Sequence, residues 1–146
     1  MKSFKFLFSL LTLVVFISCS NEEGSIDLGS KVYQLQAVSD PGLLGKVIIS
    51  ENSDSSSTVS VELYGTSTEV HPTFIYYNSL AEGGPVAITL DPCGCVKSKT
   101  VVTSLDNGKA ISYDELVKFN GHLKVHRSDI FMETILLQGD IGSNAN

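Results

Sequence analysis

Positive charge is scarce in this sequence, and its scarcity excludes several classes of partner. The 146 residues include 10 Lys and Arg against 16 Asp and Glu, a formal net charge of −6. Lys2 and Lys5 are the only charged residues before Cys19, so the chain from Cys19 onward carries 8 basic and 16 acidic residues. A surface this acidic repels phosphate backbones and anionic lipid headgroups. The charge therefore argues against nucleic acid as a partner and against electrostatic docking on a membrane.

The sequence also lacks an apolar run long enough to cross a bilayer, which takes about 20 residues. Its longest run, residues 6–16, holds eleven mostly apolar residues after two lysines, as in a secretory signal peptide. No Ala-x-Ala cleavage site follows, and Phe16-Ile17-Ser18-Cys19 resembles the lipobox of bacterial lipoproteins instead. We expect a signal peptide over 1–18, lipid on Cys19 and an acidic tether over 19–31. An ordinary secretory signal with an incidental cysteine is the alternative.

Cysteine is rare as well. Apart from Cys19, only Cys93 and Cys95 are present, in the segment Asp91-Pro92-Cys93-Gly94-Cys95. Such a pair is commonly oxidised outside the cytoplasm, although a disulfide closed over one glycine is strained. A local disulfide, thiols in a turn, and a metal or intermolecular bridge all stay open.

The motifs of common catalytic and nucleotide-binding sites are missing. The chain has no P-loop, no G-x-G-x-x-G after a strand and no G-x-S-x-G. Ser128 and Asp129 lie near His126 in sequence, but adjacent residues of a strand face opposite sides and do not form a triad by themselves. We expect no enzymatic activity.

Short alternating segments, in contrast, are abundant. Val59, Val61 and Leu63 alternate with polar residues, the pattern of a half-buried strand. Comparable segments cover 33–37, 46–50, 73–77, 86–90, 100–103, 123–126 and 133–137. Ser112 and Glu115 have the spacing of a capping box and predict a helix of about two turns near 113–119. About eight strands and one short helix favour an all-β antiparallel sandwich or barrel with Greek-key connections, followed by a tail at 143–146.

From His71 onward, a series of motifs resembles the CHRD domain, a module first recognised in chordin and found in many secreted bacterial proteins. The matching pieces are His71-Pro72, AEGGP at 81–85, DNG at 106–108, Tyr113 and Leu116, FNG at 119–121, Val125-His126 and QGDIG at 138–142. The resemblance covers about residues 32–142. It implies an immunoglobulin-like β-sandwich and a family whose biochemical activity is largely undefined.

The resemblance also implies a metal site that this chain has lost. CHRD domains commonly carry His-x-His where this chain has Phe74-Ile75-Tyr76. With the later Val-His, that pair resembles the site of copper/zinc superoxide dismutase, because residues i and i+2 of a strand face the same way. The remaining metal candidates are His71, His122 and His126. The alternative is that His126 is a hydrogen-bonded structural residue and that His71 begins a strand.

The sequence thus predicts a lipid-anchored CHRD-like module of the outer membrane or cell surface. The acidic residues after Cys19 resemble the surface-export signal of Bacteroidetes lipoproteins, although a solvated linker would look the same. We expect no enzymatic activity and no cofactor, and an envelope protein or a glycan as the partner of a binding or structural module. One alternative is a metal-binding protein with a superoxide-dismutase-like site. Another is a carbohydrate- or protein-binding surface at Tyr76 and Tyr77, of which alternation places one in the core and one outside.

Overall fold

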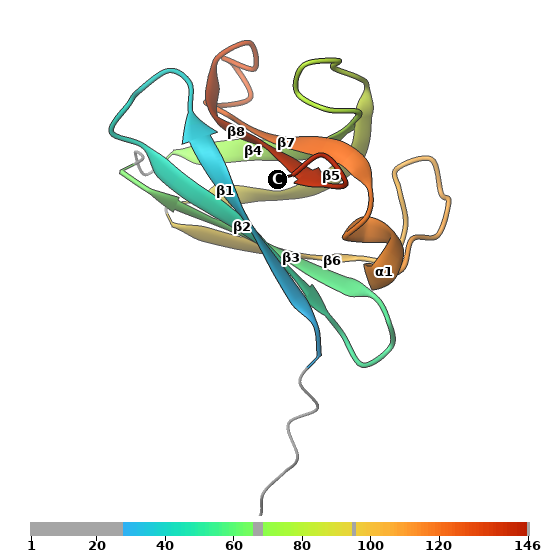
Figure 1. The fold of residues 1–146 in the computed structure, drawn as a ribbon. Helices are drawn as coiled ribbons and strands as arrows, with labels where there is room; N and C mark the ends of the chain where they lie inside the picture. The colour runs from blue at the N-terminus through green and yellow to red at the C-terminus, as the bar shows by residue number, and fades with distance from the viewer. Residues whose placement is uncertain (1–27, 66–68, 95, 146) are drawn as a thin grey trace, which may run out of the picture.

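The computed structural model describes residues 28–65, 69–94 and 96–145. Figure 1 shows antiparallel strands wound around one interior, with one short helix at the side. The strands are β1 (Ser30–Ala37), β2 (Leu44–Glu51), β3 (Ser57–Tyr64), β4 (Val70–Tyr77), β5 (Val86–Gly94), β6 (Lys97–Val102), β7 (Asn120–His126) and β8 (Ile135–Gly142), and the helix is α1 (Tyr113–Leu116). The prediction of an all-β antiparallel fold with about eight strands and one short helix is confirmed.

The strands form one sheet in the order β5-β4-β7-β8-β1-β2-β3-β6. β1 joins its two halves, because it pairs with β2 over residues 30–35 but with β8 only at Gln36 and Ala37. The two edge strands approach each other on the opposite side, where the amide of Asp91 donates to Thr100 Oγ1 at 2.7 Å. The result is a sandwich of two halves that nearly closes into a barrel.

Alternating side chains of both halves fill the interior. Val59, Val61 and Leu63 of β3 are each at most 1% exposed, as their alternation predicts. They belong to one core cluster, whose other large members include Leu35, Val47, Ile49, Ile75, Ile88, Leu90, Leu116, Leu123, Val125, Leu137 and Ile141. The core therefore runs the length of the sheet, and a pocket can open only at its ends or on its outer face.

α1 confirms the capping box but is shorter than predicted. Ser112 Oγ accepts the amide of Glu115 at 3.3 Å, and the Glu115 carboxylate accepts the amide of Ser112 at 2.9 Å. The helix has one turn instead of two, because the amides of Lys118 and Phe119 bond only three residues back and the chain then enters β7. This tighter bonding is typical of a helix end.

Two boundaries also differ from prediction. Ser30 and Lys31, placed in the tether, belong to β1, and the final strand covers Ile135–Gly142 instead of 133–137. The glycines at 139 and 142 were expected at the close of the domain, yet both pair with β7, opposite Leu123 and Asn120.

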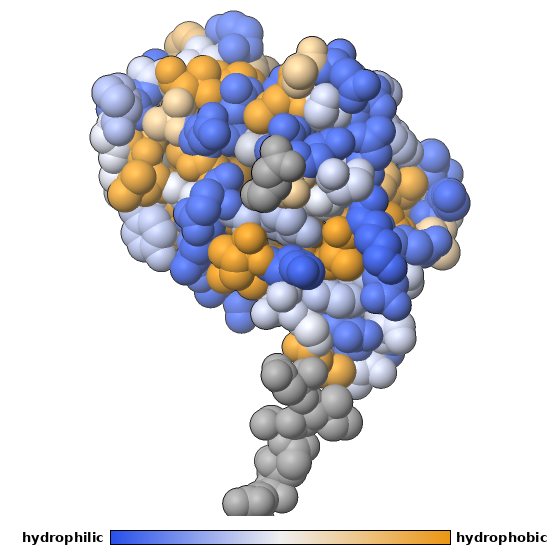
Figure 2. Space-filling model, in the orientation of Figure 1, coloured by the Kyte–Doolittle hydropathy of each residue, from blue (hydrophilic) through white to orange (hydrophobic). Residues whose placement is uncertain are grey.

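The exposed surface carries no large apolar face in the view of Figure 2, which shows small apolar patches separated by hydrophilic side chains. Exposed large apolar residues include Val32, Leu44, Val70, Val101, Ile130 and Phe131. Within residues 28–65, 69–94 and 96–145, no helix has the length and apolar character to cross a membrane.

Candidate functional site

Antiparallel pairing gives the sheet two distinct ends. We call the end where β1 begins at Ser30 the tether end, since the chain enters the sheet there. At the other end, which we call the pocket end, β1, β3 and β7 finish while β2, β4 and β8 begin. In Figure 1 the β1–β2 and β7–β8 loops lie at the top, and β1 begins at the bottom.

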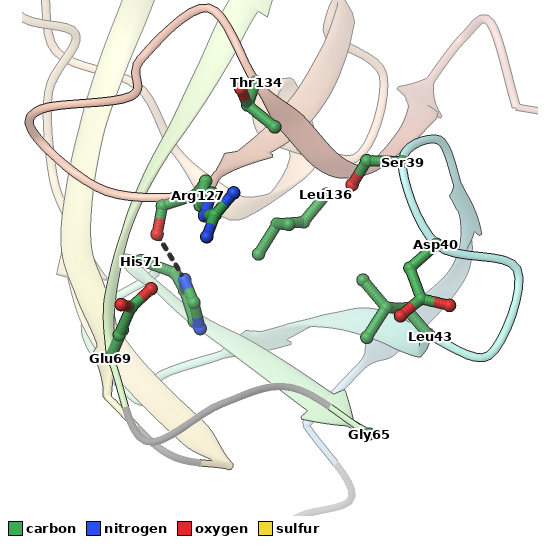
Figure 3. A pocket seen from close by; sticks show the side chains of 9 residues that line it. All are labelled: Ser39, Asp40, Leu43, Gly65, Glu69, His71, Arg127, Thr134 and Leu136. Atoms are coloured by element: carbon green, nitrogen blue, oxygen red, sulfur yellow. Dashed lines mark hydrogen bonds between the residues drawn. The ribbon is translucent and has the colours of Figure 1, made fainter.

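A cavity of about 340 Å³ opens at the pocket end, and we call it the His71 pocket. It is lined by described residues in or next to three connections that are far apart in sequence: β1–β2, β3–β4 and β7–β8. Its residues are Ser39, Asp40, Leu43, Gly65, Glu69, His71, Arg127, Thr134 and Leu136 (Figure 3). The floor is buried at Leu43 and His71, while Asp40, Glu69 and Arg127 on the rim are exposed.

The His71 ring at this floor carries a buried acceptor that has no hydrogen-bond partner among the described residues. Its Nδ1 lies 2.8 Å from the carbonyl oxygen of Arg127 (Figure 3), and a carbonyl can only accept, so Nδ1 carries the hydrogen. Nε2 of the neutral ring then holds a lone pair. The side chain is 1% exposed, and Nε2 has no hydrogen-bond partner within the described chain. Leaving such a group buried and unsatisfied costs about 1–3 kcal/mol.

Charged groups of both signs surround this acceptor. Asp40 and Glu69 supply carboxylates, and Arg127 supplies a guanidinium that also lies 5.2 Å from the centre of the Phe131 ring. The Asp40 carboxylate accepts the amide of Gly42 at 2.9 Å, which fixes the β1–β2 loop on the rim. Within a small volume the pocket therefore offers hydrogen-bond donors, acceptors and apolar contacts.

A second group of aromatic and histidine side chains lies on the outer face of β4 and β7, and we call it the Tyr76 cluster. It consists of Phe74, Tyr76, His122, Lys124 and His126. Tyr76 stacks on His122 with centroids 5.1 Å apart, Phe74 lies edge-on to His126 at 5.6 Å, and Lys124 Nζ lies 5.2 Å from the Tyr76 ring. The prediction that His122 and His126 share a face is consistent with this packing.

Within the Tyr76 cluster, His126 already uses the nitrogen that a metal would need. His126 Nδ1 bonds the carbonyl oxygen of Met132, so Nε2 accepts the hydroxyl of Tyr76 at 2.8 Å. Burial lowers the pKa of His126. His122 differs from His126: its Nδ1 lies 2.7 Å from the carbonyl oxygen of Asn78, but its Nε2 is buried and has no hydrogen-bond partner among the described residues. His126 is thus a hydrogen-bonded residue in the position where the resemblance implies a ligand.

The structure does not bring the three candidate histidines together. His71 has the strand parity of the buried Thr73 and Ile75, so it lies on the inner face of β4, whereas Tyr76 and its two histidine neighbours lie on the outer face. The described residues also contain no group of three or more His, Cys, Asp or Glu that could hold a metal ion.

The two adjacent tyrosines take the two roles that alternation requires. Tyr77 packs against the core and lies 5.4 Å from the Phe119 ring, while Tyr76 belongs to the outer face. Cys93 is fully buried, with its sulfur 3.7 Å from the carbonyl oxygen of Val61. Cys19 and Cys95 fall outside the described residues, so lipidation and the disulfide stay predictions.

Replacing Tyr76 by Phe tests the hydrogen bond to His126. We expect the free energy of unfolding to fall by about 1–3 kcal/mol, because Nε2 stays buried without its donor. The measurement is urea unfolding at about pH 8, where histidine is neutral in both states. As the pH falls below about 6.5, the unfolded state binds a proton more readily than native His126, so the parent protein itself loses stability.

Tyr64→Phe is the matched control. The Tyr64 hydroxyl also bonds a side chain, Glu62 Oε2 at 3.0 Å, but the tyrosine is 48% exposed. We expect little change there, because water replaces the lost partner. Equal losses of unfolding free energy in Tyr76→Phe and Tyr64→Phe would show that the cost at Tyr76 does not come from the burial of its bond to His126.

Sequence reasoning identified His71 but not the pocket around it. Glu69 and His71 are two residues apart in the chain, a spacing that would have suggested a shared face. Nothing in the sequence indicated that Asp40 and Arg127 would join them. Comparison of the chain with protein-family models, with curated proteins and with solved structures finds no match.

Proposed function

We propose that this protein is a lipid-anchored, non-enzymatic CHRD-like module of the outer membrane or cell surface, and that it binds a ligand in the His71 pocket. The observation that carries the proposal is a buried, unpartnered histidine nitrogen in a pocket at the end of the sheet opposite the tether. A ligand group that donates to this nitrogen would supply the hydrogen bond that the described residues do not.

The placement of the pocket fits a protein held to a membrane at its N-terminus. β1 connects the two ends of the sheet with 8 residues, or about 25 Å at roughly 3.3 Å per residue. Lipid on Cys19 would hold the tether end toward the membrane, with the pocket end directed away from it. Several acyl chains suffice for this, since each buried CH₂ contributes about 0.8 kcal/mol.

The chemistry of the pocket favours binding over catalysis. Hydrolytic enzymes activate a hydroxyl through a hydrogen bond to a base. Here Ser39 and Thr134 line the same pocket as His71, yet neither bonds its Nε2, which has no partner among the described residues. The superoxide-dismutase-like alternative is less favoured, because Tyr76 occupies the accepting nitrogen of His126.

Cys19→Ala tests the anchor. We expect the parent chain to incorporate labelled palmitate in its host and to remain with the membrane fraction, and the variant to lose both properties, because the thiol is the acylation site that the lipobox resemblance implies. Palmitate labelling of the variant at the level of the parent would overturn the lipid assignment.

The orientation is tested with the same membrane-bound chain. Ser39→Cys places a thiol on the pocket rim and Ser30→Cys places one at the tether end, and both positions are exposed. The reagent is a bulky polyethylene glycol maleimide, and the rate of the parent chain is subtracted from the rate of each variant. We expect Ser39→Cys to react several-fold faster than Ser30→Cys. Equal rates for the two variants would contradict a pocket directed away from the membrane.

A further inference from the structure

The His71 pocket restricts the chemistry of its ligand, because the buried histidine that lines it has an acceptor without a partner among the described residues. With Nδ1 donating to the carbonyl oxygen of Arg127, the neutral ring offers only the lone pair of Nε2. A ligand that satisfies this atom has to donate a hydrogen. An ionised carboxylate has no hydrogen to donate, and the negative charge of a carboxylate or a phosphate would be repelled by Asp40 and Glu69 on the rim.

The guanidinium of Arg127 excludes the opposite class. An ammonium ligand would satisfy His71 and the two carboxylates, but it would share about 340 Å³ with a permanent positive charge. A metal ion is not favoured either, since the described residues hold no group of three or more suitable ligands.

A neutral polyhydroxy compound meets every requirement. Each hydroxyl both donates and accepts, so neighbouring hydroxyls can donate to His71 Nε2 and Glu69 while accepting from Arg127. The C–H face of a sugar ring would contact Leu43 and Leu136, which lie between the polar side chains in Figure 3. The cavity lies near the lower limit of ligand pockets, about 300–1,000 Å³, and suits one sugar ring.

We infer that the His71 pocket binds a single neutral sugar unit, with one ligand hydroxyl donating to His71 Nε2 and another accepting from Arg127. The inference rests on the proposed function, since it takes the pocket as the ligand site and names the ligand class. Because the rim is exposed, the bound unit can be the end of a longer glycan.

The test is a titration of the full, isotope-labelled chain in detergent, followed by NMR of the His71 ring nitrogens. The probes are methyl glycosides of glucose, galactose, mannose, rhamnose and N-acetylglucosamine, with inorganic phosphate and ethylammonium as ionic comparisons. We expect at least one glycoside to shift the His71 signals saturably, together with the amides of Ser39 and Glu69. Neither ionic probe should do so.

Variants then identify the contacts. Arg127→Ala should weaken glycoside binding about tenfold or more, as loss of a hydrogen bond to a charged group does. Lys124→Ala is the matched control, because it removes a cation from the outer face of β7, the strand that ends just before Arg127, and it should leave affinity unchanged within twofold. His71→Phe should abolish binding. If the melting curve of His71→Phe shows that this variant does not fold, the glycoside affinity of Arg127→Ala tests the inference by itself.

The outcomes separate the two proposals. Saturable binding of phosphate or ethylammonium without any glycoside would overturn the ligand class and keep the pocket as a binding site. No response to any probe would overturn both. Glycoside binding that survives Arg127→Ala would place the site elsewhere and overturn the inference.

Discussion

Leu63→Asp is expected to leave the protein without a cooperative folded state. Leu63 lies on β3 between β2 and β6 and is 1% exposed within the core. An aspartate there would be buried as a charge or forced to take up a proton, at a cost of several kcal/mol in either case. Domains of this size are stable by only about 5–15 kcal/mol, so the substitution removes most or all of that margin.

Leu44→Asp is the matched control for this prediction. It introduces the same charge in place of the same side chain on the adjacent β2, but Leu44 is 65% exposed. We expect a change within about 0.5 kcal/mol, the usual range for surface substitutions. Thermal unfolding followed by circular dichroism compares the two. A cooperative transition of Leu63→Asp near that of the parent would show that the β3 stripe is not part of the core.

The same alternation explains how much of the fold the sequence predicts. On β3, polar and apolar residues alternate because one side of the strand faces solvent and the other faces the core. This pattern is visible in the sequence without knowing which strands pair with β3. The capping box at Ser112 is equally local, since both of its hydrogen bonds lie within four residues. Features of this kind are predictable because their cause is contained in the segment itself.

The pocket could not be predicted from the sequence, because its cause is not contained in any one segment. Asp40, Glu69 and Arg127 become neighbours only after three connections meet at one end of the sheet. Likewise, the resemblance to CHRD domains implied histidines at the positions that Phe74 and Tyr76 occupy. It could not show that the Tyr76 hydroxyl would bond His126, because the pairing of β4 with β7 brings the two side chains together.

Gly142→Ala is the second substitution with a large expected effect. Gly142 has a φ of +63°, a conformation that costs residues with a side chain about 1–2 kcal/mol. An added Cβ would also overlap the carbonyl oxygen of Phe119 and lie 2.7 Å from its amide nitrogen. These are backbone atoms held by the β7–β8 pairing and by the bond from the Ser143 amide to Phe119 O, at 3.1 Å, so they cannot move aside cheaply. We expect a loss of at least about 3 kcal/mol, within the range of severe point substitutions.

Gly108→Ala separates the two causes. Gly108 has a φ of +86°, but nothing lies within 4 Å of the position that a Cβ would occupy. It should therefore show the conformational cost alone, about 1–2 kcal/mol in urea unfolding. Equal losses in the two variants would mean that backbone conformation explains Gly142 and that the contact with Phe119 does not. A larger loss of stability at Gly142 would mean that the last residue of the Gln-Gly-Asp-Ile-Gly segment has to be glycine because β8 runs so close to the backbone of Phe119. That segment carries much of the CHRD resemblance, and its glycine would then have a packing cause that needs no ligand.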